Sequence, residues 1–91
     1  MPTISYFYGI AIRMFFNDHA PAHFHAYYGE HEAKFDIDTG EVIGGKLPAA
    51  QRRLVQQWIS RYKTELLAAW TAVRAEQAPE RIPGFDADND N

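Results

Sequence analysis

Two runs of alternating apolar and polar residues flank the dipeptide Gly29-Glu30 and together predict a β-hairpin. The runs are His23–Tyr28 and His31–Asp38, and a period of two is typical of a strand with one buried face. A two-residue turn at Gly29-Glu30 suits the primed hairpin turns, in which glycine supplies a positive φ. This register pairs apolar residues on one face, Ala26 with Ala33 and Phe24 with Phe35. A slip of one residue would expose one of these apolar sets, so the register is well specified.

The opposite face of the same hairpin carries the polar residues. There the register sets Tyr27 against Glu32, His25 against Lys34, and His23 against Asp36. His23 and His25 lie about 6.5–7 Å apart at Cα, from the rise of a strand. That distance allows one metal ion or one phosphate to be held between the two imidazoles.

The neighbouring segments predict further strands. Tyr6–Phe16 alternates and is expected to form a single strand, with Ile10, Ile12 and Met14 on its core face. The segment Asn17–Ala22, which contains Pro21, is expected to be a loop. A short strand is expected at Glu41–Ile43, ended by Gly44-Gly45. A glycine bulge would relieve the opposition of Asp38 and Glu41 that a simple turn creates.

A long amphipathic helix is expected after Pro48, which suits the first position of a helix. Apolar residues recur there at steps of three and four: Leu54, Val55, Trp58, Ile59, Tyr62, Leu66, Trp70 and Val73. A straight helix of about 28 residues would be about 42 Å long, which exceeds so small a sheet. We therefore expect either a kink near Ser60–Thr64 or a projecting C-terminal half that buries Leu66, Trp70 and Val73 against a partner.

The predicted fold class is α+β: an antiparallel sheet of three or four strands followed by a long, continuous or mildly kinked C-terminal helix packed on one face. Residues 1–78 are expected to form one domain, and residues 79–91 an acidic, disordered tail. The expected core joins the sheet to the helix: Ile10, Ile12, Met14, Phe24, Ala26, Ala33, Phe35 and Ile37 beneath Leu54, Trp58 and Tyr62.

Composition and charge narrow the range of functions. The chain has no cysteine, which excludes disulfides and thiolate metal sites and fits a cytoplasmic protein. No stretch approaches the length of a membrane span, and no signal-peptide pattern is seen. Residues 79–91 hold four of the twelve acidic and one of the nine basic residues. Residues 1–78 are therefore neutral and lack a broad electrostatic surface for duplex DNA.

Three segments are similar to a known family: MPTISYFYGIAIRMFFNDHAPAHFHAYYGE, DIDTGEV, and LP before RRLVQQWISRYKTELLAAW. They resemble the small bacterial proteins of the domain of unknown function numbered 4160, over about residues 1–75. The family usually has two prolines before the HFHA segment, and here Ala22 takes the second place. The resemblance implies no catalytic residue. It implies a genetic context in which a second small gene lies beside the first, as in toxin–antitoxin modules.

The histidines support two chemical interpretations. The first is a metal site for zinc or a similar divalent ion at His19, His23 and His25, with Asp18 or Asp36 completing the set or Asp36 orienting His23. The second is metal-free acid–base chemistry on RNA by His23, His25 and Asp36, with Arg13 or Lys34 as the cation for the phosphate. Aromatic and basic residues share that face, as in surfaces that bind single-stranded RNA.

Two non-chemical alternatives remain. The histidines could only form structural hydrogen bonds, or the sheet face and helix end could bind a partner as a non-enzymatic interaction module. We predict a cytosolic component of a two-gene, toxin–antitoxin-like module that acts through a histidine-centred surface. The expected partners are a second copy, the product of a neighbouring gene, or RNA, with no membrane. The sequence does not decide between an enzyme and a binding protein.

Overall fold

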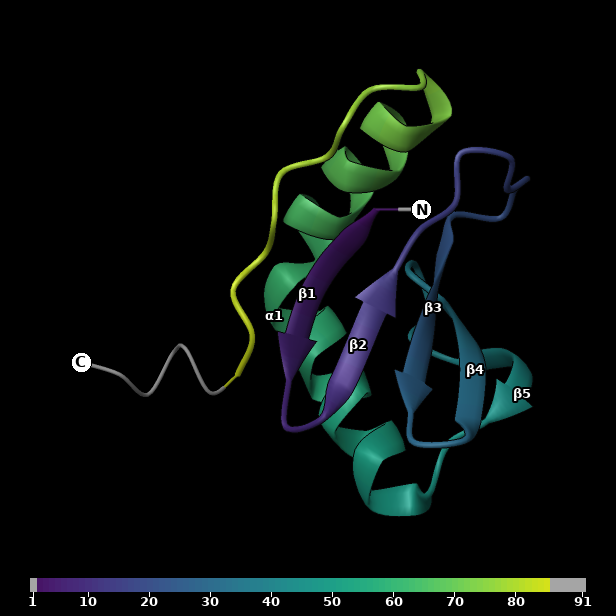
Figure 1. The fold of residues 1–91 in the computed structure, drawn as a ribbon, viewed down its shortest axis with the longest axis vertical. Coiled ribbons are helices and arrows are strands. Elements are labelled where there is room, and N and C mark those ends of the chain that lie inside the picture. Colours follow the sequence, from purple (N-terminus) through teal and green to yellow (C-terminus); the bar gives the residue numbers. More distant parts are fainter. Residues whose placement is uncertain (1, 86–91) are drawn as a thin grey trace.

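The computed structural model describes residues 2–85 and consists of one sheet and one helix (Figure 1). The sheet has five antiparallel strands in the order β1-β2-β3-β4-β5, so each strand pairs with its neighbour in sequence. The strands are β1 (Thr3–Phe7), β2 (Ile10–Arg13), β3 (His23–Tyr28), β4 (His31–Asp36) and β5 (Val42–Lys46), and the helix is α1 (Ala49–Arg74). The α+β class is confirmed, with more strands than the three or four expected.

The hairpin of β3 and β4 has the predicted register. Phe24 pairs with Phe35, Ala26 with Ala33, and His23 with Asp36. The apolar pairs are fully buried, as are Ile10, Ile12, Met14 and Ile37. Trp58 and Tyr62 of α1 are buried with them, whereas Leu54 is half-buried. The hydrophobic period therefore predicted both the pairing and the core.

The expected single strand at Tyr6–Phe16 is wrong, because the chain turns within it. Tyr8 and Gly9 have φ values of 50° and 80°, and two successive positive values make the tight turn that joins antiparallel neighbours. Gly9 was the sequence signal for this turn. Ile10, Ile12 and Met14 keep their place in the core, while Tyr8 and Phe16 are exposed.

The last strand is longer than expected, since β5 includes Gly44 and Gly45 instead of ending before them. Lys34 pairs with Gly44 and Phe35 with Val42, so Ile43 is an extra residue in the ladder. This irregularity lies beyond the Thr39-Gly40 turn, where we expected a glycine bulge, and its extra residue is not a glycine. Gly45 has a positive φ, and a Cβ there would collide with the backbone oxygen of Glu32.

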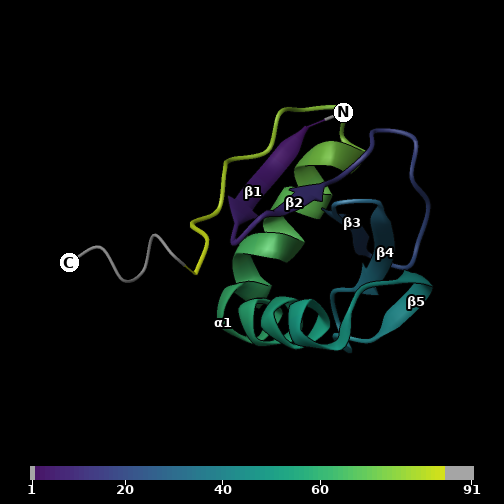
Figure 2. The same cartoon turned by 60° about the horizontal axis from the view of Figure 1, so that its bottom comes forward.

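The helix is kinked at Tyr62, where φ is −115° and ψ is 27°. This lies within the predicted interval Ser60–Thr64. Figure 2 shows that the two halves of α1 run in clearly different directions beside the sheet. Leu66 and Val73 in the second half are fully buried in this chain. The reason for expecting that half to associate with a partner is thereby removed.

Part of the predicted tail packs on the domain. The backbone N–H of Ile82 donates to the carbonyl of Ile4 at 2.9 Å, and the indole N–H of Trp58 donates to the carbonyl of Pro83 at 2.9 Å. Ile82 is buried, and the chain after α1 returns along β1 (Figure 1). Residues 79–85 thus differ from the disordered tail we predicted, whereas residues 86–91 lie outside the described residues.

Among residues 2–85, no helix has both the length and the apolar character needed to cross a membrane.

Candidate metal centre

The candidate site lies on the sheet face opposite the core, at the start of β3. His23 and His25 share this face, as alternation predicts, and Phe24 between them points into the core. A polar strand face that points away from the core is expected to be exposed, but here the two residues are only 6% and 7% exposed. Their cover comes from outside the sheet. The ring of Phe15 lies 4.6 Å from that of His25, and the ring of Trp70, from the second half of α1, lies 5.2 Å from that of His23.

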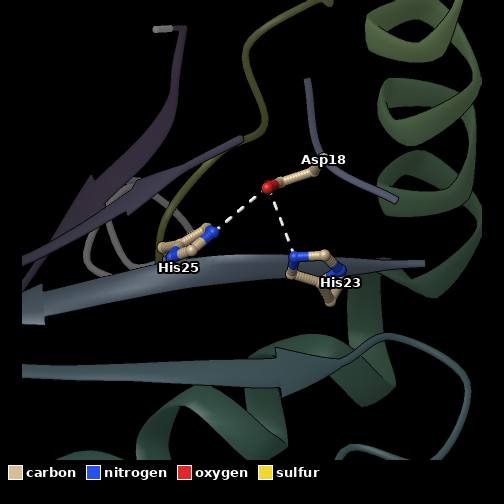
Figure 3. Close-up of side chains that lie close together, drawn as sticks. All are labelled: Asp18, His23 and His25. Carbon is tan, nitrogen blue, oxygen red and sulfur yellow. Dashed lines mark hydrogen bonds and ion pairs between the residues drawn. The ribbon is translucent and has the colours of Figure 1, made fainter. Parts of the chain in front are cut away.

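The loop between β2 and β3 brings a carboxylate to both imidazoles (Figure 3). Oδ2 of Asp18 lies 3.3 Å from Nε2 of His23 and 3.1 Å from Nε2 of His25. One donor atom from each of the three residues lies within 4.8 Å of the other two. Two imidazole nitrogens therefore converge on one carboxylate oxygen inside a largely buried site.

The hydrogen bond at Nδ1 of His23 fixes the tautomer of its ring. Nδ1 lies 2.7 Å from the carbonyl oxygen of Pro21, and a carbonyl only accepts hydrogen bonds, so Nδ1 carries the proton. In the neutral ring, Nε2 then presents a lone pair toward Asp18. Within the described residues this buried Nε2 has no hydrogen-bond partner, so its 3.3 Å contact with Asp18 is a close approach without hydrogen-bond geometry.

His25 has carboxylates at both ring nitrogens. Nδ1 lies 3.2 Å from Oε2 of Glu32, and Nε2 lies 3.1 Å from Oδ2 of Asp18. Both contacts are hydrogen bonds only if the ring carries two protons. If Nδ1–H donates to Glu32, the Nε2 lone pair faces Asp18, as in His23. In both histidines Nδ1 lies beside an acceptor other than Asp18, and Nε2 lies beside the same Asp18 oxygen.

Tyr27 continues this network on the side away from Asp18. Its ring stacks on that of His25 with a centroid distance of 6.4 Å, and its phenol forms a hydrogen bond with Glu32. Burial, followed by the charge and hydrogen bond of Glu32, raises the pKa of Tyr27 above its ordinary value of 10.0. The phenol is therefore a neutral donor that helps to fix the Glu32 carboxylate.

The other predicted site residues lie outside this cluster. His19 is exposed and is not among the three donors. Asp36 pairs with His23 along the backbone, but its carboxylate accepts the N–H groups of Asp38 and Thr39 at 2.8 and 3.0 Å in the following loop. The carboxylate that faces His23 is Asp18 instead.

The two predicted cations flank His25. Arg13 pairs with His25 from β2 and Lys34 from β4, so the three residues form one row across the sheet. The guanidinium of Arg13 lies 5.2 Å above the ring of Tyr27, and Lys34 is exposed. Both cations lie on the same sheet face as the histidines, as the alternation of side chains along the strands predicted.

Sequence reasoning missed Glu32, although the register contained the signal. Glu32 pairs directly with Tyr27, which makes it the diagonal neighbour of His25, and long side chains reach across such diagonals. Asp18 was only one of two alternative carboxylates in the metal interpretation, because the conformation of a loop does not follow from periodicity.

The fold and the site define a small α+β protein with a cluster of two buried histidines and a half-buried aspartate between its sheet and a covering loop. The model of a family described as a domain of unknown function, DUF4160, matches residues 9–71. This match spans well over half of the chain, which therefore belongs to that family, and the resemblance seen in the sequence is confirmed. Comparisons with curated proteins and with solved structures give no match.

Proposed function

We propose that this protein binds one divalent transition-metal ion, with zinc as the first candidate, through Asp18, His23 and His25. The observation that carries the proposal is the convergence of two Nε2 atoms on one carboxylate oxygen while both Nδ1 atoms are held by other acceptors. Metal-ligating histidines characteristically donate their other N–H to a backbone carbonyl or a carboxylate. Pro21 and Glu32 supply one partner of each kind.

The distances support a metal ion at this position. In a tetrahedral zinc site with bonds of about 2.0–2.1 Å, two ligand atoms lie about 3.3–3.4 Å apart. The two distances from Oδ2 of Asp18, 3.3 and 3.1 Å, are close to that value. All three atoms lie within 4.8 Å of one another, so the most distant pair would have to approach by at most about 1.5 Å.

The donor set also limits the choice of ion. Imidazole and carboxylate suit zinc and other borderline divalent ions, and without cysteine no thiolate can take part. Three protein ligands leave at least one coordination position for water or another molecule, which is the arrangement of catalytic rather than structural zinc sites. The ion would supply Lewis acidity, and the protein would hold its ligands through Pro21 and Glu32.

Burial favours this proposal over the two alternatives that use the same histidines. Acid–base catalysis on RNA needs imidazoles that reach the polymer within hydrogen-bond distance, and these rings lie beneath Phe15, Trp70 and the loop. In a purely structural cluster, each neutral ring has one nitrogen lone pair that faces a carboxylate. For His23 this carboxylate is Asp18, and for His25 it is Asp18 or Glu32, according to the tautomer. The two-gene, toxin–antitoxin-like role stays a prediction, testable by co-purification with the product of the neighbouring gene.

Zinc titration of the metal-stripped full-length protein by calorimetry tests the proposal. We expect one equivalent to bind and to stabilise the fold, by about 2.7 kcal/mol when zinc is one hundred times its dissociation constant. Asp18→Asn keeps the shape and removes the ligand charge, so it should weaken zinc binding strongly. Glu32→Gln removes only the carboxylate behind His25 and should weaken it by about tenfold to hundredfold.

Matched controls separate the site from general effects of charge. Asp36→Asn changes the carboxylate that accepts the loop N–H groups, and His31→Gln changes an exposed histidine on β4. Both variants should bind zinc like the unmodified protein. No zinc binding by the unmodified protein, or equal binding by Asp18→Asn, would overturn the proposal.

A further inference from the structure

An open depression of about 430 Å³ lies beside the candidate centre. It is lined by Phe16, Asn17, Asp18, His19 and Arg74. Four of these residues belong to the loop that carries Asp18, and the fifth is the last residue of α1. Pockets for small molecules have volumes of about 300–1,000 Å³. The depression is therefore large enough for a small ligand, and Asp18 belongs to both the depression and the cluster.

The exposures of the three donor residues indicate where the centre opens. The side chains of His23 and His25 are 7% and 9% exposed, whereas that of Asp18 is 22% exposed. The sheet lies beneath the imidazoles, and Phe15 and Trp70 pack against them. Asp18 is thus the least covered of the three donors, and it is also the one that lines the depression.

Arg74 is held in place at the wall of this depression. Its Nη1 donates to the backbone carbonyl of Asp18 at 3.2 Å, and its guanidinium lies 5.7 Å from the centre of the Trp70 ring. Trp70 in turn packs on His23. The guanidinium is therefore positioned by the same residues that surround the metal ligands, and it has further N–H donors beyond the one that Asp18 accepts.

The charges on this side favour an anion. A divalent ion bound by one carboxylate and two neutral imidazoles keeps about one positive charge, and Arg74 adds a permanent second one. The planar guanidinium suits carboxylate and phosphate, whose two oxygens it can bind together. Asn17 and His19 add side chains that can donate hydrogen bonds, and the exposed ring of Phe16 adds an apolar wall.

We infer that the depression binds a small oxyanion, a carboxylate or a phosphate, which ligates the metal ion at its open position and pairs with Arg74. This inference rests on the proposed metal site and names the class of ligand that the site accepts. Oxyanions of both kinds share the chemistry that Arg74 and the ion recognise, and the experiment below distinguishes them by using one probe of each.

Cobalt(II) provides a direct measurement, because its visible absorption reports the ligands around the ion. The full-length protein loaded with cobalt is titrated separately with inorganic phosphate and with acetate. We expect a saturable change of the spectrum with at least one of these anions. Arg74→Gln should lower the affinity for that anion by about tenfold to hundredfold, the range expected for a lost charged hydrogen bond. The affinity for cobalt itself should change little.

Two further variants complete the experiment. Arg53→Gln removes an exposed arginine from the first half of α1 and should leave anion binding unchanged. Arg74→Lys keeps the charge and loses the planar guanidinium, so it should lower the affinity for the anion less than Arg74→Gln does. If Arg74→Gln proves unstable in thermal unfolding, Arg74→Lys alone tests whether residue 74 contributes to anion binding.

The outcomes separate the inference from the proposal beneath it. If cobalt does not bind, the metal site itself is wrong. If cobalt binds but neither anion changes its spectrum, or if both Arg74 variants bind the anion as tightly as the unmodified protein, the metal site stands and the anion site is overturned.

Discussion

At the scale of the residue, two histidines on one strand face have different partners behind them. His23 is held by a backbone carbonyl two residues earlier in the chain, and His25 by a carboxylate from the next strand. Both partners leave Nε2 directed at Asp18 (Figure 3). The contact behind His23 thus comes from the local path of the chain, and the contact behind His25 from the pairing of two strands.

The raised pKa of Tyr27 predicts how stability depends on pH. Burial and Glu32 disfavour the phenolate in the folded state, so the unfolded chain loses this proton first as the pH rises through about 10. Below that pH both states are protonated and the contribution is fully present. Above it, the free energy of unfolding should fall, because the unfolded state binds fewer protons.

Urea unfolding at several values between about pH 9 and pH 11 measures this dependence. Tyr27→Phe should flatten the decline, whereas Tyr6→Phe, at an exposed position of β1, should not. A decline equally steep in Tyr27→Phe and the unmodified protein would show that the shift of Tyr27 has no effect on stability.

At the scale of the element, the kinked helix is the feature that closes the site. The first half of α1 covers the core face of the sheet through Trp58, whose ring lies 5.8 Å from that of Phe24. The kink at Tyr62 redirects the second half so that Trp70 reaches His23 on the other side of β3. A straight helix would not provide both contacts.

Leu66→Ala tests whether the second half of α1 packs on its own chain. Leu66 is fully buried, and such substitutions in a core cost about 2–5 kcal/mol. Urea unfolding should show a loss in that range, and the loss should not depend on protein concentration. Thr64→Ala, at an exposed position of the same half, should change the free energy of unfolding by about 0.5 kcal/mol or less. A loss that grows on dilution would instead restore the expected association through this half.

At the scale of the whole molecule, the chain after α1 completes the fold. Residues 79–85 return along β1, which is an edge strand, and the Ile82 N–H donates to Ile4 there. The carbonyl of Pro83 satisfies the indole of Trp58, the largest fully buried side chain. The segment therefore supports one edge of the sheet and the centre of the core together.

Ile82→Ala should destabilise the protein although it lies outside every strand and helix. Ile82 is buried, and removing a large aliphatic side chain from a buried site costs about 2 kcal/mol or more. Thermal unfolding followed by tryptophan fluorescence measures the change, with the exposed neighbour Arg81→Ala as the control. Equal midpoints for the two variants would mean that this segment contributes nothing to stability in solution.

The sequence by itself determined the hairpin, the core and the extent of the helix. These follow from periods of two and of about 3.6 residues, which a chain must satisfy to bury its apolar side chains. The register of β3 and β4 was predictable because a slip would expose Phe24 or Phe35. The length of a straight helix left two alternatives, a kink or a projecting C-terminal half, and the structure has the kink. The family was also recognisable from its motifs.

Only the tertiary structure decided how the candidate site is built. Asp18 reaches both histidines because an irregular loop folds back across the sheet, and no periodicity specifies the path of a loop. The burial of His23 depends on Trp70, which is 47 positions away in the sequence and arrives there only because the helix bends. Likewise, residues 79–85 have too few apolar side chains to predict a helix or strand, yet Ile82 is buried against the core. Contacts of this kind depend on where separate elements meet in space. The histidines could therefore be predicted as site residues from the sequence, but the side chains that contact them could not.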